Sequence, residues 1–132
     1  MKSRHTAFVV VSTTVDGISG AGRLAQIIVE NRLAACVQYR PIRSVYRWKN
    51  KIESAEEYLL VAKTRASLAN RLVKFIQSVH SYELPEVTVM PITAGLAKYL
   101  DWIYDETAGL PRHKQSRGKG RIGRTQRGRA RV

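Results

Sequence analysis

Two hydrophobic periods alternate along the chain, and together they predict a mixed order of strands and helices. Residues 7–11 are continuously apolar and β-branched, which is typical of a central strand buried on both faces. Apolar residues then recur three and four positions apart, at Ala21, Leu24, Ala25 and Ile28. That spacing predicts a helix that lies on the sheet.

A long hairpin is predicted next. Residues 34–48 and 52–64 both have an extended pattern, and Asn50 lies in the tight turn between them, because asparagine tolerates a positive φ. Proline cannot donate to a strand ladder, so Pro41 indicates an edge position or a bulge. Arms of this length would extend beyond a sheet built from strands of about five to six residues. Oligomerisation is the simplest way to cover the backbone edges of such an overhang.

A second helix, a short strand and a last helix complete the pattern. The apolar stripe of the second helix is Leu68, Leu72, Phe75, Ile76 and Val79. Ser67 is its predicted N-cap. Residues 87–90 form a short strand between two prolines, and residues 96–105 form the last helix. The order βαββαβ followed by a helix predicts a ferredoxin-like fold of the α+β class.

Charge divides the chain into two parts. It carries 23 Lys and Arg residues against 10 Asp and Glu, a net charge of +13. Residues 112–132 hold nine of the basic residues and no acidic one, which leaves residues 1–111 at +4. A segment with so few apolar side chains cannot offset the entropy of ordering and is predicted to be disordered. We therefore divide the chain into a domain, residues 1–108, and a basic tail, residues 109–132.

Several classes of protein are disfavoured. The single cysteine, Cys36, excludes an intramolecular disulfide and a multi-cysteine zinc site. No segment approaches the roughly 20 apolar residues of a membrane span, and the run at residues 7–11 is too short for a signal core. The sequence therefore predicts a cytoplasmic protein without a membrane partner. It has no glycine-rich phosphate loop, His-Glu-x-x-His motif or nucleophile elbow, so we do not expect an enzyme.

The best site candidate is the stretch His80-Ser81-Tyr82-Glu83-Leu84-Pro85-Glu86, which follows the second helix. Loops after helix ends often present functional side chains. The candidate metal ligands are His80, Glu83 and Glu86. The alternative interpretation is that the imidazole caps the helix C-terminus, where a cation is favoured, and that both carboxylates are solvated.

Several separated motifs resemble the CutA divalent-cation tolerance family over about residues 7–107. Besides the loop above, they are Thr13-Thr14, Arg32-Leu33-Ala34-Ala35-Cys36-Val37, Ser44-Val45-Tyr46-Arg47-Trp48, Lys51-Ile52-Glu53, Lys63-Thr64, Pro91-Ile92 and Tyr99-Leu100-Asp101-Trp102. The resemblance implies a ferredoxin-like protomer in a tight trimer whose long hairpin pairs across subunits. It also implies a role in copper and divalent-cation tolerance, with metal binding.

The chain departs from the family pattern at three places. Ser81 replaces a proline, and residues 16–20 replace an acidic opening of the first helix. Thr13 stands where enteric members carry a cysteine proposed as a copper ligand, while His80 matches the other proposed ligand. Loss of the soft thiolate disfavours Cu(I), whereas imidazole and carboxylate suit Cu(II) or Zn²⁺, not tightly bound.

A cleft between subunits is the second candidate site. Its candidate residues are Cys36, Trp48, Glu53, Lys63 and Tyr82. If Lys63 faces such a cleft near Glu53 and His80, it would bind an anionic ligand. Otherwise the lysine is a solvated charge, the aromatic residues belong to an interface or the core, and Cys36 is a small buried hydrophobe.

Two alternative functions stay open. One is a module like the PII signalling proteins, whose fold is similar to that of the CutA family, which binds a small anion between subunits. The other is a nucleic-acid-binding hub, in which residues 112–132 bind polyanions weakly through their positive charge. The tail has no aromatic residue for base stacking, which favours a merely solubilising extension over a nucleic-acid-binding arm.

Overall fold

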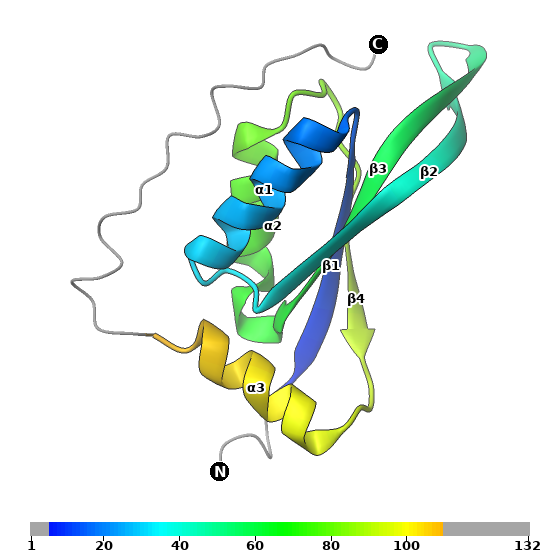
Figure 1. The fold of residues 1–132 in the computed structure, drawn as a ribbon. Coiled ribbons are helices and arrows are strands. Elements are labelled where there is room, and N and C mark those ends of the chain that lie inside the picture. Colours follow the sequence, from blue (N-terminus) through cyan, green and yellow to red (C-terminus); the bar gives the residue numbers. More distant parts are fainter. Residues whose placement is uncertain (1–5, 110–132) are drawn as a thin grey trace.

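The computed structural model describes residues 6–109, which form one four-stranded antiparallel sheet and three α-helices (Figure 1). In chain order the elements are β1 (Phe8–Val15), α1 (Ile18–Glu30), β2 (Cys36–Trp48), β3 (Lys51–Arg65), a 3₁₀ turn (Ala66–Leu68), α2 (Ala69–Val79), β4 (Val87–Ile92) and α3 (Ala97–Thr107). The strands lie in the order β2-β3-β1-β4. This confirms the predicted ferredoxin-like α+β arrangement. Within residues 6–109 no helix is long and apolar enough to cross a membrane.

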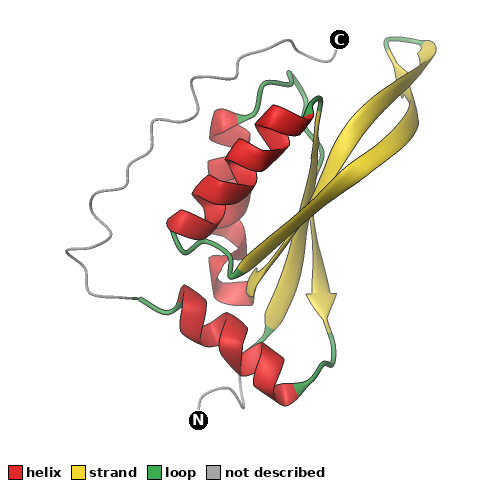
Figure 2. Ribbon diagram, in the orientation of Figure 1, coloured by secondary structure: helices red, strands yellow, loops and turns green. Residues whose placement is uncertain are grey.

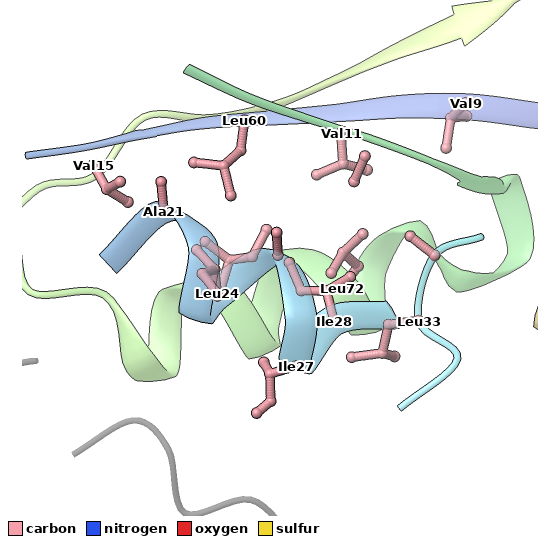
Figure 3. Packing of buried hydrophobic residues seen from close by; sticks show 14 residues of the cluster. Val9, Val11, Val15, Ala21, Leu24, Ile27, Ile28, Leu33, Leu60 and Leu72 are labelled. Carbon is pink, nitrogen blue, oxygen red and sulfur yellow. The ribbon is translucent and has the colours of Figure 1, made fainter. Parts of the chain in front are cut away.

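The main core lies between one face of the sheet and the helices α1 and α2 (Figures 2 and 3). Val9, Val11 and Val15 of β1 point towards this core, as does Leu60 of β3. The predicted stripes of α1 and α2 supply most of the helical side, and Leu72 is fully buried. Each such side chain contributes about 1.5–3 kcal/mol when it leaves water. The basic tail, from residue 110 on, lies outside the described residues.

Strand β1 is longer than its apolar run predicts. It continues to Val15, and Ser12, Thr13 and Thr14 lie inside it as buried residues. The apolar run at residues 7–11 therefore marks only the first part of the strand. Backbone pairing explains the difference, because β3 pairs with β1 as far as Val15 and β4 pairs with it as far as Thr13, which satisfies the N–H and C=O groups of this stretch.

The start of the second helix also differs from the prediction. A 3₁₀ turn, Ala66–Leu68, precedes α2, and Leu68 occupies the N-cap position without a side-chain hydrogen bond. Ser67 lies inside the 3₁₀ turn and is exposed, so its assignment as N-cap is wrong. Ser67 is thus part of the 3₁₀ turn itself, so Leu68 and not the serine is the residue that directly precedes α2.

The hairpin of β2 and β3 extends well beyond the sheet, as predicted. Its ladder runs from Cys36 opposite Lys63 to Trp48 opposite Lys51, whereas β1 covers β3 only as far as Tyr58. Residues 42–57 therefore form an arm, in which each strand has the other as its sole partner within residues 6–109 (Figure 1). At its tip Lys49 and Asn50 both have positive φ, 52° and 67°, which suits a two-residue hairpin turn.

Pro41 occupies an edge position, which is the first of the two alternatives predicted for it. Strand β2 is at the edge of the sheet, and Pro41 is the partner of Tyr58 in an unbroken ladder. An edge strand tolerates proline because one of its sides needs no N–H donor. A bulge is therefore not required at this position.

Helix α3 packs on the other face of the sheet, at one end only. Ile103 is fully buried there against Phe8 and Ala35. Arg65 holds the C-terminus of α3, because its Nε donates to Thr107 Oγ1 at 2.9 Å and its Nη2 donates to the Thr107 carbonyl at 2.7 Å. Cations are favoured at this end of a helix. The rest of this sheet face, which we call the open face, is not covered by any helix of residues 6–109.

Candidate functional site

His80 anchors the loop that follows α2. The loop begins where α2 ends at Val79, and His80 takes the C-cap position. Its Nδ1 accepts a hydrogen bond from the Tyr82 backbone N–H at 3.1 Å. Since Nδ1 accepts, the ring hydrogen resides on Nε2, which donates to the Thr14 carbonyl at 2.9 Å. Both ring nitrogens therefore hold backbone groups, and the neutral imidazole ties this loop to the end of β1.

A buried carboxylate anchors the same loop to the base of the arm. Glu57 is only 4% exposed, and its Oε2 accepts a hydrogen bond from the Tyr82 hydroxyl at 2.8 Å. Its Oε1 accepts a second one from Ser44 Oγ at 2.7 Å. Burying a carboxylate is unfavourable unless such donors compensate it. Sequence reasoning missed Glu57 and Ser44, and the only signal was an acidic residue directly before the apolar block at residues 58–62.

Replacing Tyr82 with phenylalanine should therefore destabilise the domain. The change leaves Glu57 Oε2 buried without its hydroxyl donor, and we expect the free energy of unfolding to fall by about 1–3 kcal/mol. Urea unfolding followed by circular dichroism measures it. Tyr39→Phe is the matched control, because Tyr39 is 43% exposed and should change stability by less than about 0.5 kcal/mol. Equal effects of the two variants would contradict the role of the Glu57–Tyr82 bond.

A cavity of about 630 Å³ lies between the arm and this loop. Its lining residues are Thr14, Ser44, Val45, Tyr46, Arg47, Trp48, Glu57, Leu84, Pro85 and Glu86. Strand alternation and register place Ser44, Tyr46 and Trp48 on the face of β2 that also carries Glu57 on β3. The Trp48 Nε1 atom is buried and has no hydrogen-bond partner among the described residues. The cavity thus combines aromatic rings, a buried carboxylate and an unsatisfied donor.

The predicted metal ligands do not form a complete site within one protomer. Glu83 and Glu86 are both exposed, and of these two only Glu86 lines the cavity. Within residues 6–109 no group of three or more His, Cys, Asp or Glu side chains could hold a metal ion. The imidazole of His80 would become a ligand only by giving up one of its two backbone partners. A cation at this loop would need water or another subunit to complete its ligands.

The predicted cleft residues lie in separate parts of the protomer. Cys36 and Lys63 face each other as partners in the ladder, and Lys63 Nζ donates to Gln38 Oε1 at 2.6 Å. Glu53 lies ten residues from Lys63 along β3, which corresponds to about 33 Å. One protomer therefore does not bring Lys63 to Glu53. Trp48 also lies near the tip of the arm, so the five residues could meet only across subunits.

Tyr99 of α3 contacts Cys36, a pairing that the sequence did not predict. Partial burial is the largest cause that raises the pKa of Tyr99 above its usual value of 10.0, and the charge of Cys36 and a hydrogen bond to it raise the pKa further. Tyr99 also stacks on Trp102, with ring centroids 5.6 Å apart. Cys36 is half-buried, and its contact in α3 is with Tyr99.

The ionisation of Tyr99 gives a second testable prediction. Because its pKa is raised, Tyr99 should keep its proton in the folded protein at pH values just above 10, at which the unfolded chain has begun to release it. The stabilisation that comes from this difference in proton binding is therefore complete below pH 10 and is lost as the pH rises from 10 through the raised pKa. Ultraviolet titration of the full chain, with Tyr99→Phe subtracted, measures this pKa. Cys36→Ala should move it back towards 10. A Tyr99 pKa at or below 10 in the unchanged protein would contradict the contact.

Comparison with known proteins gives consistent matches. The family model described as CutA1 divalent ion tolerance protein matches residues 9–106. Protein CutA, chloroplastic, from Arabidopsis thaliana is 42% identical over 106 residues, 80% of this chain and 58% of the relative. Protein CutA from Mus musculus is 46% identical over 91 residues, 68% of this chain and 51% of the relative. The chain thus spans little more than half the length of these relatives.

A solved structure agrees with these matches. The crystal structure of CutA1 from Oryza sativa has a TM-score of 0.76 and 40% identity, and the match covers 80% of this chain and 97% of that one. The similarity therefore extends over nearly all of the described residues.

Proposed function

Because the chain belongs to the CutA1 divalent ion tolerance family, we propose that it is a non-enzymatic divalent-cation tolerance protein that works as a homotrimer. The open face of the sheet is the observation that supports the homotrimer, and the family match supports the role in cation tolerance. The half-exposed or exposed apolar residues of the open face are Val10, Ile42, Leu59, Val61 and Met90. Soluble monomers rarely leave a large contiguous apolar patch uncovered, so we expect further copies of the chain to cover it.

The arm supports the same assembly. Along residues 51–57 one backbone edge of β3 has no partner strand among the described residues, and β4 has a free outer edge. Natural proteins cover such edges. In a closed ring of three, each arm would reach the next copy and no edge would be left open.

The ring would also join the separated candidate residues. The arm would carry Trp48 and Glu53 of one copy towards the Cys36 and Lys63 region of its neighbour, which makes a cleft between subunits. Tyr82 lies at the base of the arm, where it would border the same cleft. Such a cleft would account for the separation of the five predicted residues in the single protomer.

For the cation we propose weak binding of Cu²⁺ or Zn²⁺ at the loop of His80, Glu83 and Glu86, with water as a further ligand. Imidazole and carboxylate are suitable donors for these ions. Neutral imidazole is the ligating form, so affinity should fall as the pH drops below about 6.5. The cytoplasmic location stays a prediction, since the Arabidopsis relative is named chloroplastic.

Light scattering coupled to size exclusion tests the assembly. Three copies of a 14.9 kDa chain should give a mass of about 45 kDa. A monomer at micromolar concentration would refute the trimer. A thermal-shift screen of divalent metals against nucleotides tests the ligand class, because a ligand that binds the native state raises its melting temperature. A response to nucleotides but not to metals would favour the PII-like alternative.

A further inference from the structure

The described part of the chain ends beside α2, at a point that two arginines hold. Arg65, which directly precedes the 3₁₀ turn before α2, donates from Nη2 to the Thr107 carbonyl at 2.7 Å. Arg32, which follows α1, donates from Nη1 to the Glu106 carbonyl at 2.7 Å. The end of α3 therefore lies next to the layer of α1 and α2 (Figure 1), and the basic tail starts there.

The outer surface of α2 carries positive charge that no carboxylate compensates. Arg71 and Lys74 are both exposed, and a spacing of three residues makes them neighbours on the helix surface. Within residues 6–109 neither of them forms an ion pair. Neither α2 nor the 3₁₀ turn before it contains an acidic residue. Because α2 and the open face lie on opposite sides of the sheet, the proposed trimer leaves this surface accessible (Figure 2).

The charged surface of α2 lies close to the start of the tail. Arg71 follows Arg65 by six positions along the 3₁₀ turn and α2, which corresponds to about 10 Å. Lys74 lies about 5 Å further along the helix. The carboxylate of Glu106, at the end of α3, is paired with Arg32 at 3.4 Å and is thereby partly neutralised. The basic residues of the tail and of α2 can therefore bind one continuous polyanion.

The composition of the tail favours a nucleic acid over other polyanions. Seven of the nine basic residues in 112–132 are arginines, and four glycines are interspersed among them. Guanidinium groups bind phosphate through paired hydrogen bonds and stack on unpaired bases, so they can replace the aromatic side chains that the tail lacks. Stable binding to a membrane surface usually combines basic residues with an apolar anchor, and Ile122 and Val132 are the only large apolar residues of this segment.

We propose that residues 112–132 and the outer surface of α2 together bind single-stranded nucleic acid. The tail would contact the phosphate backbone and the unpaired bases, and Arg71 and Lys74 would contact the part of the strand that lies over the domain. Binding would depend little on the base sequence, because phosphate contacts and stacking do not distinguish the bases. It requires neither the trimer nor the metal ligands, so it can hold or fail independently of the proposed function.

Fluorescence anisotropy on the full-length chain tests the proposal, with labelled oligonucleotides of about 20 nucleotides. Oligo(U) and oligo(dT) should both bind, and the logarithm of the binding constant should fall linearly with the logarithm of the salt concentration. A full-length chain whose nine tail cations are replaced by glutamine should bind at least about tenfold more weakly at about 50 mM salt. Tighter binding of oligo(U) than of oligo(dT) would identify RNA as the preferred ligand, and the reverse would identify DNA.

Variants of the helices separate a defined surface from general attraction. Arg71→Gln, Lys74→Gln should reduce the steepness of the salt dependence by about 1.4, since each phosphate contact with a single strand contributes about 0.7. Lys98→Gln is the matched control. Lys98 is also exposed, but it shares α3 with Asp101 and Asp105, which repel phosphate. We expect the Lys98 variant to keep the salt dependence of the unchanged protein.

The arginines of the tail distinguish a nucleic acid from any other polyanion. Replacing all seven with lysine keeps the charge, removes the guanidinium planes and should weaken the binding of oligo(U) by about fivefold. Vesicles with about 30% phosphatidylserine should compete poorly at equal phosphate concentration. The proposal would be overturned by no binding at about 50 mM salt, by undiminished binding of the glutamine tail, by equal effects of the α2 and α3 variants, or by full competition from the vesicles.

Discussion

Replacing Met90 with glutamate should convert the trimer into monomers without unfolding the chain. Met90 is 54% exposed in the protomer and lies on the open face as the partner of Val10. In a monomer the new carboxylate points into water, so folding should be unaffected. In the trimer the same carboxylate would be buried without a partner in each copy, which costs several kcal/mol each time. Light scattering should show the mass falling from about 45 kDa towards 14.9 kDa at low micromolar concentration.

The adjacent residue provides the matched control. Val89 is 42% exposed, lies on the same strand and faces the helix side of the sheet. Val89→Glu introduces the same charge into the same edge strand, and we expect that variant to remain a trimer. If both variants stay trimeric, or both dissociate, the open face is not the contact surface that we propose.

The element order could be predicted because burial imposes a local period on the sequence. The stripe of α1 places Ala21 and Ile28 against the sheet, and both are buried. The long arm was also predictable, since the extended pattern on each side of Asn50 outlasts an ordinary strand. Pro41 indicated an edge position or a bulge, and the edge position is the one observed. These features depend on residues close together in sequence, where hydrophobic period and turn chemistry act directly.

The buried contacts of the loop after α2 could not be predicted, because they depend on strand register. Ser44 and Glu57 share a face only in the observed ladder, and a slip of one residue would separate them. The apolar run shows only the first part of β1 for a related reason, since the backbone pairing of Thr13 comes from strands far away in sequence. Long-range pairing also decides which residues line the cavity. The sequence therefore identified the loop but not its partners.

The last prediction concerns His80, and it separates the structural role of this residue from its proposed role as a metal ligand. Replacing it with alanine removes the bonds to the Thr14 carbonyl and the Tyr82 N–H. Two net hydrogen bonds amount to about 1–3 kcal/mol, so the melting temperature should fall by several degrees. If the imidazole is also a ligand, calorimetry at pH 7.5 should show at least about tenfold weaker binding of Cu²⁺ or Zn²⁺. The native affinity itself should be modest, because the ring must give up a backbone partner to bind the ion.

The control removes the carboxylates and leaves the histidine contacts in place. Glu83 and Glu86 are exposed, so a Glu83→Gln, Glu86→Gln chain should keep the melting temperature within about two degrees. If these carboxylates join His80 at the metal, this chain should nevertheless bind the ion more weakly. A loss of stability in His80→Ala together with unchanged metal affinity in both variants would show that the histidine is only an anchor. The cation would then have to bind elsewhere on the protein, and the loop would serve to hold the base of the arm.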